Sequence, residues 1–117
     1  MEINVINRAV AIINPKAPYL EWANGVAQSY ESLEDLVKSS RAILIPNDAY
    51  DGMEMFIKEN FAQIFELELE SWVSDNHYWP SKRDYDTFKK WFDVEAYALV
   101  VDLSEAELLR EPYGGWE

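Results

Sequence analysis

His77 is the single histidine of the chain, and it lies two residues after Asp75 in the segment SDNHYWP. An imidazole titrates near neutral pH, and a carboxylate beside it can orient it for proton transfer. General acid–base catalysis needs a further positioned group, and the neighbours of His77 all have ordinary uses in a loop or at the start of a helix. We therefore assign no catalytic residue and do not favour an enzyme.

The same segment contains aromatic residues that suit a binding contact. Tyr78 and Trp79 follow His77 directly, in a polar loop before Pro80. Tyrosine and tryptophan dominate the energetics of protein interfaces. We name Asp75, His77, Tyr78 and Trp79 as candidate contacts to a ligand or partner. The alternative use of Trp79 is to cap the core beneath the loop.

Lys16 and Asp48 form a second candidate site. Each lies in a proline-marked turn after a predicted strand. If the two strands are parallel, their turns meet at one edge of the sheet, in the crevice where open α/β folds bind ligands. Lys16 and Asp48 would then give that crevice a charged pair. Turn preferences alone also explain both residues.

The chain has no cysteine, so it has no disulfide, thiolate metal ligand or cysteine nucleophile. Glu66 and Glu70 stand one turn apart on a predicted helix, but with Asp75 and His77 they match no calcium loop or zinc motif. Phosphate-binding glycine loops and glycine-flanked serine elbows are also missing. We expect neither a metal site nor a cofactor.

The charge of the chain restricts its partners. Asp and Glu number 22 against 10 Lys and Arg, which gives a net charge of −12. This charge opposes binding to nucleic acid and to anionic membranes, and leaves protein partners open. The first residues do not resemble a secretion signal, and the apolar runs are too short to span a bilayer. We expect a soluble, cytoplasmic protein.

These residues must be positioned by an alternation of strands and helices. The predicted strands are 8–13, 41–45 and 94–103, the last with both faces covered. The predicted helices begin at Pro18, at Ser32, at a capping box of Asp51 and Glu54, at one of Ser81 and Asp84, and at one of Ser104 and Glu107.

The helix after Asp51 is the longest of the chain, and its apolar stripe runs from Met53 to Val73. Trp22, Trp72 and Trp91 lie on apolar helical stripes and are predicted to be core residues. We expect one domain over residues 1–117, with a loose tail over residues 111–117.

Helices between strands imply crossovers. The predicted fold is α/β (or α+β), with a small three- to four-stranded mixed or parallel sheet packed by a long amphipathic helix and shorter helices. A ferredoxin-like variant is the main alternative. It needs another strand, which residues 1–6 would have to supply.

Four segments carry a resemblance to a known family: NRAVAIINPKAPYLEW, RAILIP, FELELESWVSDNHYWP and FKKWFDVEAYALVVDL. Together they resemble a family of small uncharacterised bacterial proteins, over most of the chain. The resemblance implies a bacterial, cytoplasmic, single-domain α/β protein. It implies no functional residue.

Our leading hypothesis is a non-enzymatic, acidic protein-interaction or adaptor module that binds through the loop of residues 75–83 or the acidic face of the long helix. One alternative is a small enzyme or ligand-binding protein that uses the crevice of Lys16 and Asp48. Another is a nucleic-acid mimic that blocks a basic protein. Oligomeric state is left open.

Overall fold

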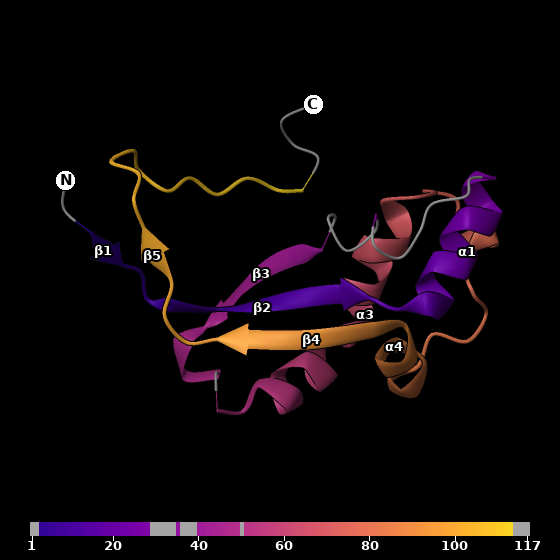
Figure 1. Cartoon of the computed structure of the whole chain (residues 1–117), viewed down its shortest axis with the longest axis horizontal. Helices are drawn as coiled ribbons and strands as arrows, with labels where there is room; N and C mark the ends of the chain where they lie inside the picture. The colour runs from indigo at the N-terminus through magenta and orange to yellow at the C-terminus, as the bar shows by residue number, and fades with distance from the viewer. Residues whose placement is uncertain (1–2, 29–34, 36–39, 50, 114–117) are drawn as a thin grey trace.

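A three-stranded antiparallel sheet lies at the centre of the protein. The computed structural model describes residues 3–28, 35, 40–49 and 51–113. β2 is the middle strand and pairs antiparallel with a neighbour on each side, in the order β3-β2-β4 (Figure 1). The strands are β2 (Arg8–Pro15), β3 (Arg41–Pro46) and β4 (Phe92–Tyr97). The strands predicted at residues 8–13 and 41–45 are confirmed.

One face of this sheet carries the core. Alternate residues of β2 are buried, namely Ala9, Ala11 and Ile13, and the residues between them point to the opposite face. The small alanines allow covering side chains to approach the strand closely. The helices on this side are α1 (Ala17–Ala27), α3 (Met53–Glu70) and α4 (Tyr85–Trp91). The predicted α/β class, a small sheet packed by one long and shorter helices, is confirmed.

α3 is the long amphipathic helix that the sequence predicts. Its buried residues recur at helical spacing and include Ile57, Ile64, Phe65 and Leu69. The helix ends at Glu70, before the predicted end at Val73, and no side chain caps its start at Gly52. The predicted capping box of Asp51 and Glu54 is therefore wrong.

Aromatic rings join α1, α3 and α4 into one cluster. The ring of Tyr19 lies 4.8 Å from that of Phe92, and Phe88 lies 5.2 Å from Phe92, between ring centroids. α4 begins after Asp84, whose carboxylate accepts a hydrogen bond from the Thr87 amide at 2.8 Å. Asp84 is thus the cap itself, and the predicted box that began at Ser81 is wrong. The three tryptophans that were predicted to be core residues are partly buried and pack against the core: Trp22, Trp72 and Trp91.

The strand directions differ from the prediction of a mixed or parallel sheet. β3 and β4 run in the same direction, but β2 lies between them and runs the opposite way. The connection through α3 is therefore a split β-α-β crossover. α1 stays at the end of the sheet where β2 finishes, instead of running back along it (Figure 1). The next strand consequently starts from that same end and is antiparallel.

A short two-stranded ribbon, which we call the arm, extends from the sheet. It pairs β1 (Asn4–Val5) with β5 (Val101–Asp102) (Figure 1). Val5 pairs with Val101, although continuing the β2–β4 register would bring it opposite Asp102. This one-residue shift is what a β-bulge produces, with the additional residue in the strand that joins β1 to β2.

The arm corrects two predictions about the carboxyl-terminal part of the chain. The predicted continuous strand over residues 94–103 is divided into β4 and β5, and Tyr97, Leu99 and Val101 are exposed instead of covered. The helix predicted at Ser104 is absent, since residues 103–113 contain no helix.

Two predictions fall wholly or partly on residues that are not described. The short helix that begins at Ser32 lies outside the described residues except at Asp35, which is helical. Residues 111–113 of the predicted loose tail are exposed, and the remainder of the tail lies outside the described range.

Phe65→Ala should lower the free energy of unfolding by about 3–5 kcal/mol, because it leaves a cavity among the rings of α4 and β4. Met55→Ala is the matched control, since Met55 is exposed on the same helix. Urea unfolding measures both variants. A loss for Phe65→Ala no larger than that for Met55→Ala would contradict the packing described.

Candidate functional site

The loop of Asp75 and His77 has the geometry of a turn. The Asp75 carboxylate accepts a hydrogen bond from the His77 backbone amide at 2.9 Å and caps a short 3₁₀ helix, η2 (Asn76–Tyr78). The His77 ring is exposed and lies edge-on to the ring of Tyr78. Asp75 therefore binds the backbone of His77 rather than its imidazole, which is not the contact of an acid–base pair.

Trp79 and Tyr78 have different environments. The Trp79 ring packs against the core, its indole N–H donates to the Val73 carbonyl at 2.9 Å, and the Arg83 guanidinium lies 5.6 Å from the ring centre. Tyr78 exposes its ring, while its carbonyl accepts a hydrogen bond from the Trp22 indole. Trp79 thus caps the core beneath the loop, which was the alternative to a binding contact. The exposed aromatic surface of the loop is supplied by His77 and Tyr78.

The structure does not bring Lys16 and Asp48 together. Lys16 follows the end of β2, whereas Asp48 lies in η1 (Asn47–Ala49), beyond the residue of β3 that pairs with Arg8. The length of β2, roughly 25 Å, separates them. The predicted crevice of Lys16 and Asp48 is wrong because it required parallel strands.

Lys16 has a structural use. Its amide donates to the Trp91 carbonyl at 2.8 Å, and its ammonium donates to the Lys89 carbonyl at 2.9 Å. The ammonium also lies 3.7 Å from Asp93. A cation at the carboxyl end of a helix is favourable, so Lys16 ties the end of β2 to α4.

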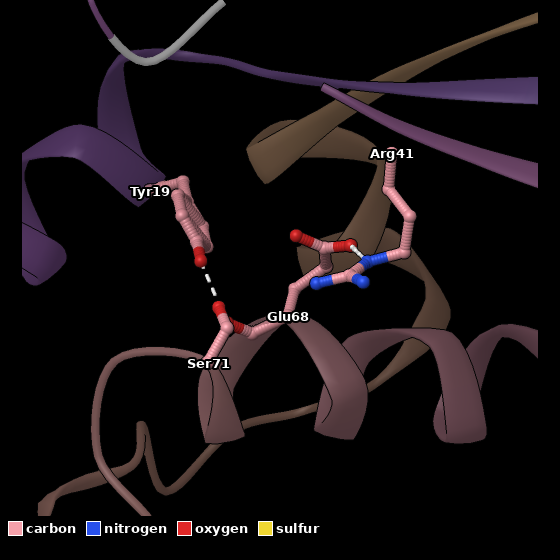
Figure 2. A network of polar contacts seen from close by, with 4 residues as sticks. All are labelled: Tyr19, Arg41, Glu68 and Ser71. Carbon is pink, nitrogen blue, oxygen red and sulfur yellow. Dashed lines mark hydrogen bonds and ion pairs between the residues drawn. The ribbon is translucent and has the colours of Figure 1, made fainter. Parts of the chain in front are cut away.

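A buried polar network lies between α1, α3 and β3, and the sequence analysis did not find it. The Glu68 carboxylate, in a residue that is 7% exposed, pairs with the Arg41 guanidinium (Figure 2). The Tyr19 hydroxyl donates to the Glu68 carbonyl at 2.6 Å, and the Ser71 hydroxyl donates to the same oxygen at 2.7 Å. One glutamate therefore holds three elements together.

Burial and charge act in opposite directions on this network. Desolvation raises the pKa of Glu68, and the hydrogen bond and charge of Arg41 partly offset that rise. Burial likewise raises the pKa of Tyr19 above its ordinary value. A glutamate on the apolar stripe of α3, four residues after Ile64, is the sequence signal that could have identified the network.

A concave site lies where α3, α4 and β4 meet. The cavity has a volume of about 360 Å³, with an apolar floor that includes Met53, Ile57 and Phe88, and with Glu54 and Lys89 among its lining residues. Its size is within the range of small-molecule pockets. It contains none of the predicted site residues.

The most unusual feature of the described molecule is an uncovered apolar surface. Leu44, Val10 and Tyr97 form a row across β3, β2 and β4 on the face opposite the helices. Leu44 and Tyr97 are each 51% exposed. We define the outer apolar surface as these residues together with the exposed apolar residues of the arm and the segment after it: Ile3, Val5, Leu99, Val101, Leu103, Leu108 and Leu109.

The arm is amphipathic. Val5 and Val101 are directly paired, so their side chains lie on one face of the ribbon, with those of Ile3 and Leu103 beside them. Asn4 and Asp102 are paired on the opposite face. The apolar face is exposed at every position: Ile3 66%, Val5 61%, Val101 43% and Leu103 56%.

A cavity of about 510 Å³ joins the parts of this surface. It lies between the β1–β2 strand, Leu44 of β3 and the segment of Leu108, Leu109 and Arg110. Arg8 and Arg110 both line it, so two of the few cations of the chain lie in an otherwise largely apolar groove. The groove and the arm form one candidate binding site.

Among the described residues, no group of three or more His, Cys, Asp or Glu side chains is placed to hold a metal ion. None of the helices in the described ranges is both long and apolar enough to cross a bilayer. Comparisons with protein-family models, curated proteins and solved structures gave no match. The family resemblance therefore stays a prediction.

Arg41→Met should lower the free energy of unfolding by about 3–5 kcal/mol near pH 7, because the Glu68 carboxylate would stay buried without its cation. A carboxyl whose folded pKa is raised contributes stability below its unfolded pKa and loses it as the pH rises. Without Arg41 the pKa of Glu68 rises further. The stability that the Arg41→Met variant loses relative to the wild type should therefore be smaller at about pH 5.5 than at about pH 8.

The double variant Arg41→Met/Glu68→Met removes both charges and should recover most of the loss. Urea unfolding at the two pH values measures all three proteins. An Arg41→Met penalty that is independent of pH, or one that the double variant does not relieve, would contradict a buried charged pair.

Trp79→Ala should lower the urea midpoint clearly, because it removes a ring packed on the core and an indole hydrogen bond to Val73. Tyr78→Ala is the neighbouring control and should leave the midpoint nearly unchanged, since its ring is exposed. Equal midpoints for the two variants would show that the Trp79 contacts contribute nothing.

Proposed function

We propose that the protein is a non-enzymatic, acidic protein-interaction module that binds a protein through its outer apolar surface. The observation that supports it best is the amphipathic arm, whose apolar face has no covering layer in the described parts of the chain. A cytoplasmic location and a bacterial origin, inferred from composition and from the family resemblance, belong to the same proposal.

The energetics of apolar surface favour this function. Burying a valine or leucine side chain contributes about 1.5–3 kcal/mol, and soluble monomers rarely leave large contiguous apolar patches in water. Here the exposed apolar residues are adjacent: the pairing of Val5 with Val101 and the cavity shared by Val5, Leu44 and Leu108 connect the arm to the sheet. Such a surface is typical of an interface.

The proposed binding site differs from the loop of residues 75–83 and the acidic helix face that the sequence suggested. The loop of residues 75–83 contributes the exposed rings of His77 and Tyr78, which form a smaller patch at the end where α1 lies. The outer apolar surface is larger, because it combines the apolar row on the sheet with the apolar face of the arm. We therefore assign the principal contact to that surface and a secondary contact to the loop.

Leu44→Thr/Tyr97→Thr should abolish capture of the partner while leaving the fold intact. Threonine keeps the preference for a strand but removes exposed apolar area. Native lysate would be passed over the immobilised wild type, the double variant and Met55→Gln, a control at an exposed position of α3. Quantitative mass spectrometry would compare the captured proteins.

The expected result is at least one protein, this chain included, that the wild type and Met55→Gln retain and the double variant loses. Identical capture by all three proteins would overturn the proposed binding surface. Urea unfolding of the double variant should give a midpoint close to that of Met55→Gln. A loss of captured protein then reflects the changed surface and not a changed fold.

A further inference from the structure

The accessible surface of the chain is larger than that of a compact monomer. A folded monomer of 13.7 kDa is expected to expose roughly 6,600 Å², whereas this chain exposes 8333 Å², an excess of about 1,700 Å². A standard protein interface covers about 800 Å² on each partner, and obligate dimers cover more. The excess is summed over the whole chain and is about twice the area that one protomer buries in a standard interface.

The dimensions of the chain, like its accessible area, are larger than those of a compact domain. The radius of gyration is 15.8 Å, against about 13 Å for a compact domain of 117 residues. In Figure 1 the arm projects beyond the layered body, and the segment after β5 turns back above β3, where Leu108 and Leu109 line a cavity with Leu44. These are the same segments that carry most of the outer apolar surface.

The arm has little to stabilise it among the described residues. A two-stranded ribbon is marginal in water unless a face of it packs against something, and this one has two residues in each strand. Its apolar face is 43–66% exposed, so that face gives the folded monomer little burial energy. An ordered arm of this kind is expected where a second chain covers it.

We infer that the second chain is another copy of this protein, in a two-fold dimer in which the outer apolar surfaces of the protomers cover each other. This inference rests on the proposed function and names the partner. The surface contains its own complement, because the exposed face of the arm and the row of Leu44, Val10 and Tyr97 on the sheet are both apolar. Apolar β faces pack directly at about 10 Å. A two-fold contact uses the same patch on both subunits.

Charge distinguishes a second copy from a basic partner. Two protomers of net charge −12 repel each other at long range, whereas the surface that meets is apolar and its groove is lined by Arg8 and Arg110. Salt screens the repulsion, since the Debye length falls from about 30 Å at 0.01 M to about 8 Å at 0.15 M. A dimer of this chain should therefore tighten as salt is added, and a complex with a basic protein should weaken.

The test is sedimentation equilibrium of the purified full chain over a range of concentrations, at low and at physiological salt. The wild type and Met55→Gln should reach twice the mass of 13.7 kDa, with a dissociation constant that falls as salt rises. Leu44→Thr/Tyr97→Thr should weaken the dimer at least tenfold. Val101→Asp, which places a carboxylate on the exposed face of the arm, should weaken it as much without entering the core.

A wild type that sediments as a monomer at every concentration and salt would overturn the second copy as the partner. If the lysate capture nevertheless depends on Leu44 and Tyr97, the proposed function stands and the occupant is a different protein. If capture is also independent of them, both proposals fall. A dimer that neither variant weakens would use another surface and would equally overturn the inference.

Discussion

An apolar face of a sheet needs a covering layer, and in the described parts of this protein helices cover one of the two faces. The middle strand β2 sets this constraint. Its buried alanines Ala9 and Ala11 accept the core side chains on one side, while the partly buried Val10 on the other side joins the exposed Leu44 and Tyr97 in a row. The choice of residues along one strand thus determines both where the core lies and which surface remains available.

The polar network at Glu68 holds the covered face together. It links α3 to β3 through Arg41 and to α1 through Tyr19. Breaking such a pair is costly, because each charge is desolvated only in the presence of the other. Lys16 likewise ties the end of β2 to α4, so a cation that was a candidate site residue in the sequence is used to fix the end of the sheet.

Much of the architecture was predictable because it depends on local periodicity. The β-branched-rich run of residues 8–13 and the helical stripe after Met53 identify β2 and α3 directly. Strand direction was not predictable, since it depends on where α1 packs, and that position is set by contacts between residues far apart in sequence, such as Tyr19 with Phe92. The crevice of Lys16 and Asp48 failed for this reason. The loop residues were placed correctly as a turn, but the burial of Trp79 depends on the fold.

The exposed surface was missed for a related reason. The sequence of β4 and β5 is apolar enough for a strand covered on both faces, and only the tertiary structure shows that one face lacks a layer among the described residues. Oxidative footprinting of Tyr97 and Tyr78, which are 51% and 57% exposed in the single chain, tests the account most directly. We predict that Tyr97 becomes protected as the protein concentration rises while Tyr78 stays reactive. A constant ratio of modification at the two tyrosines would contradict it.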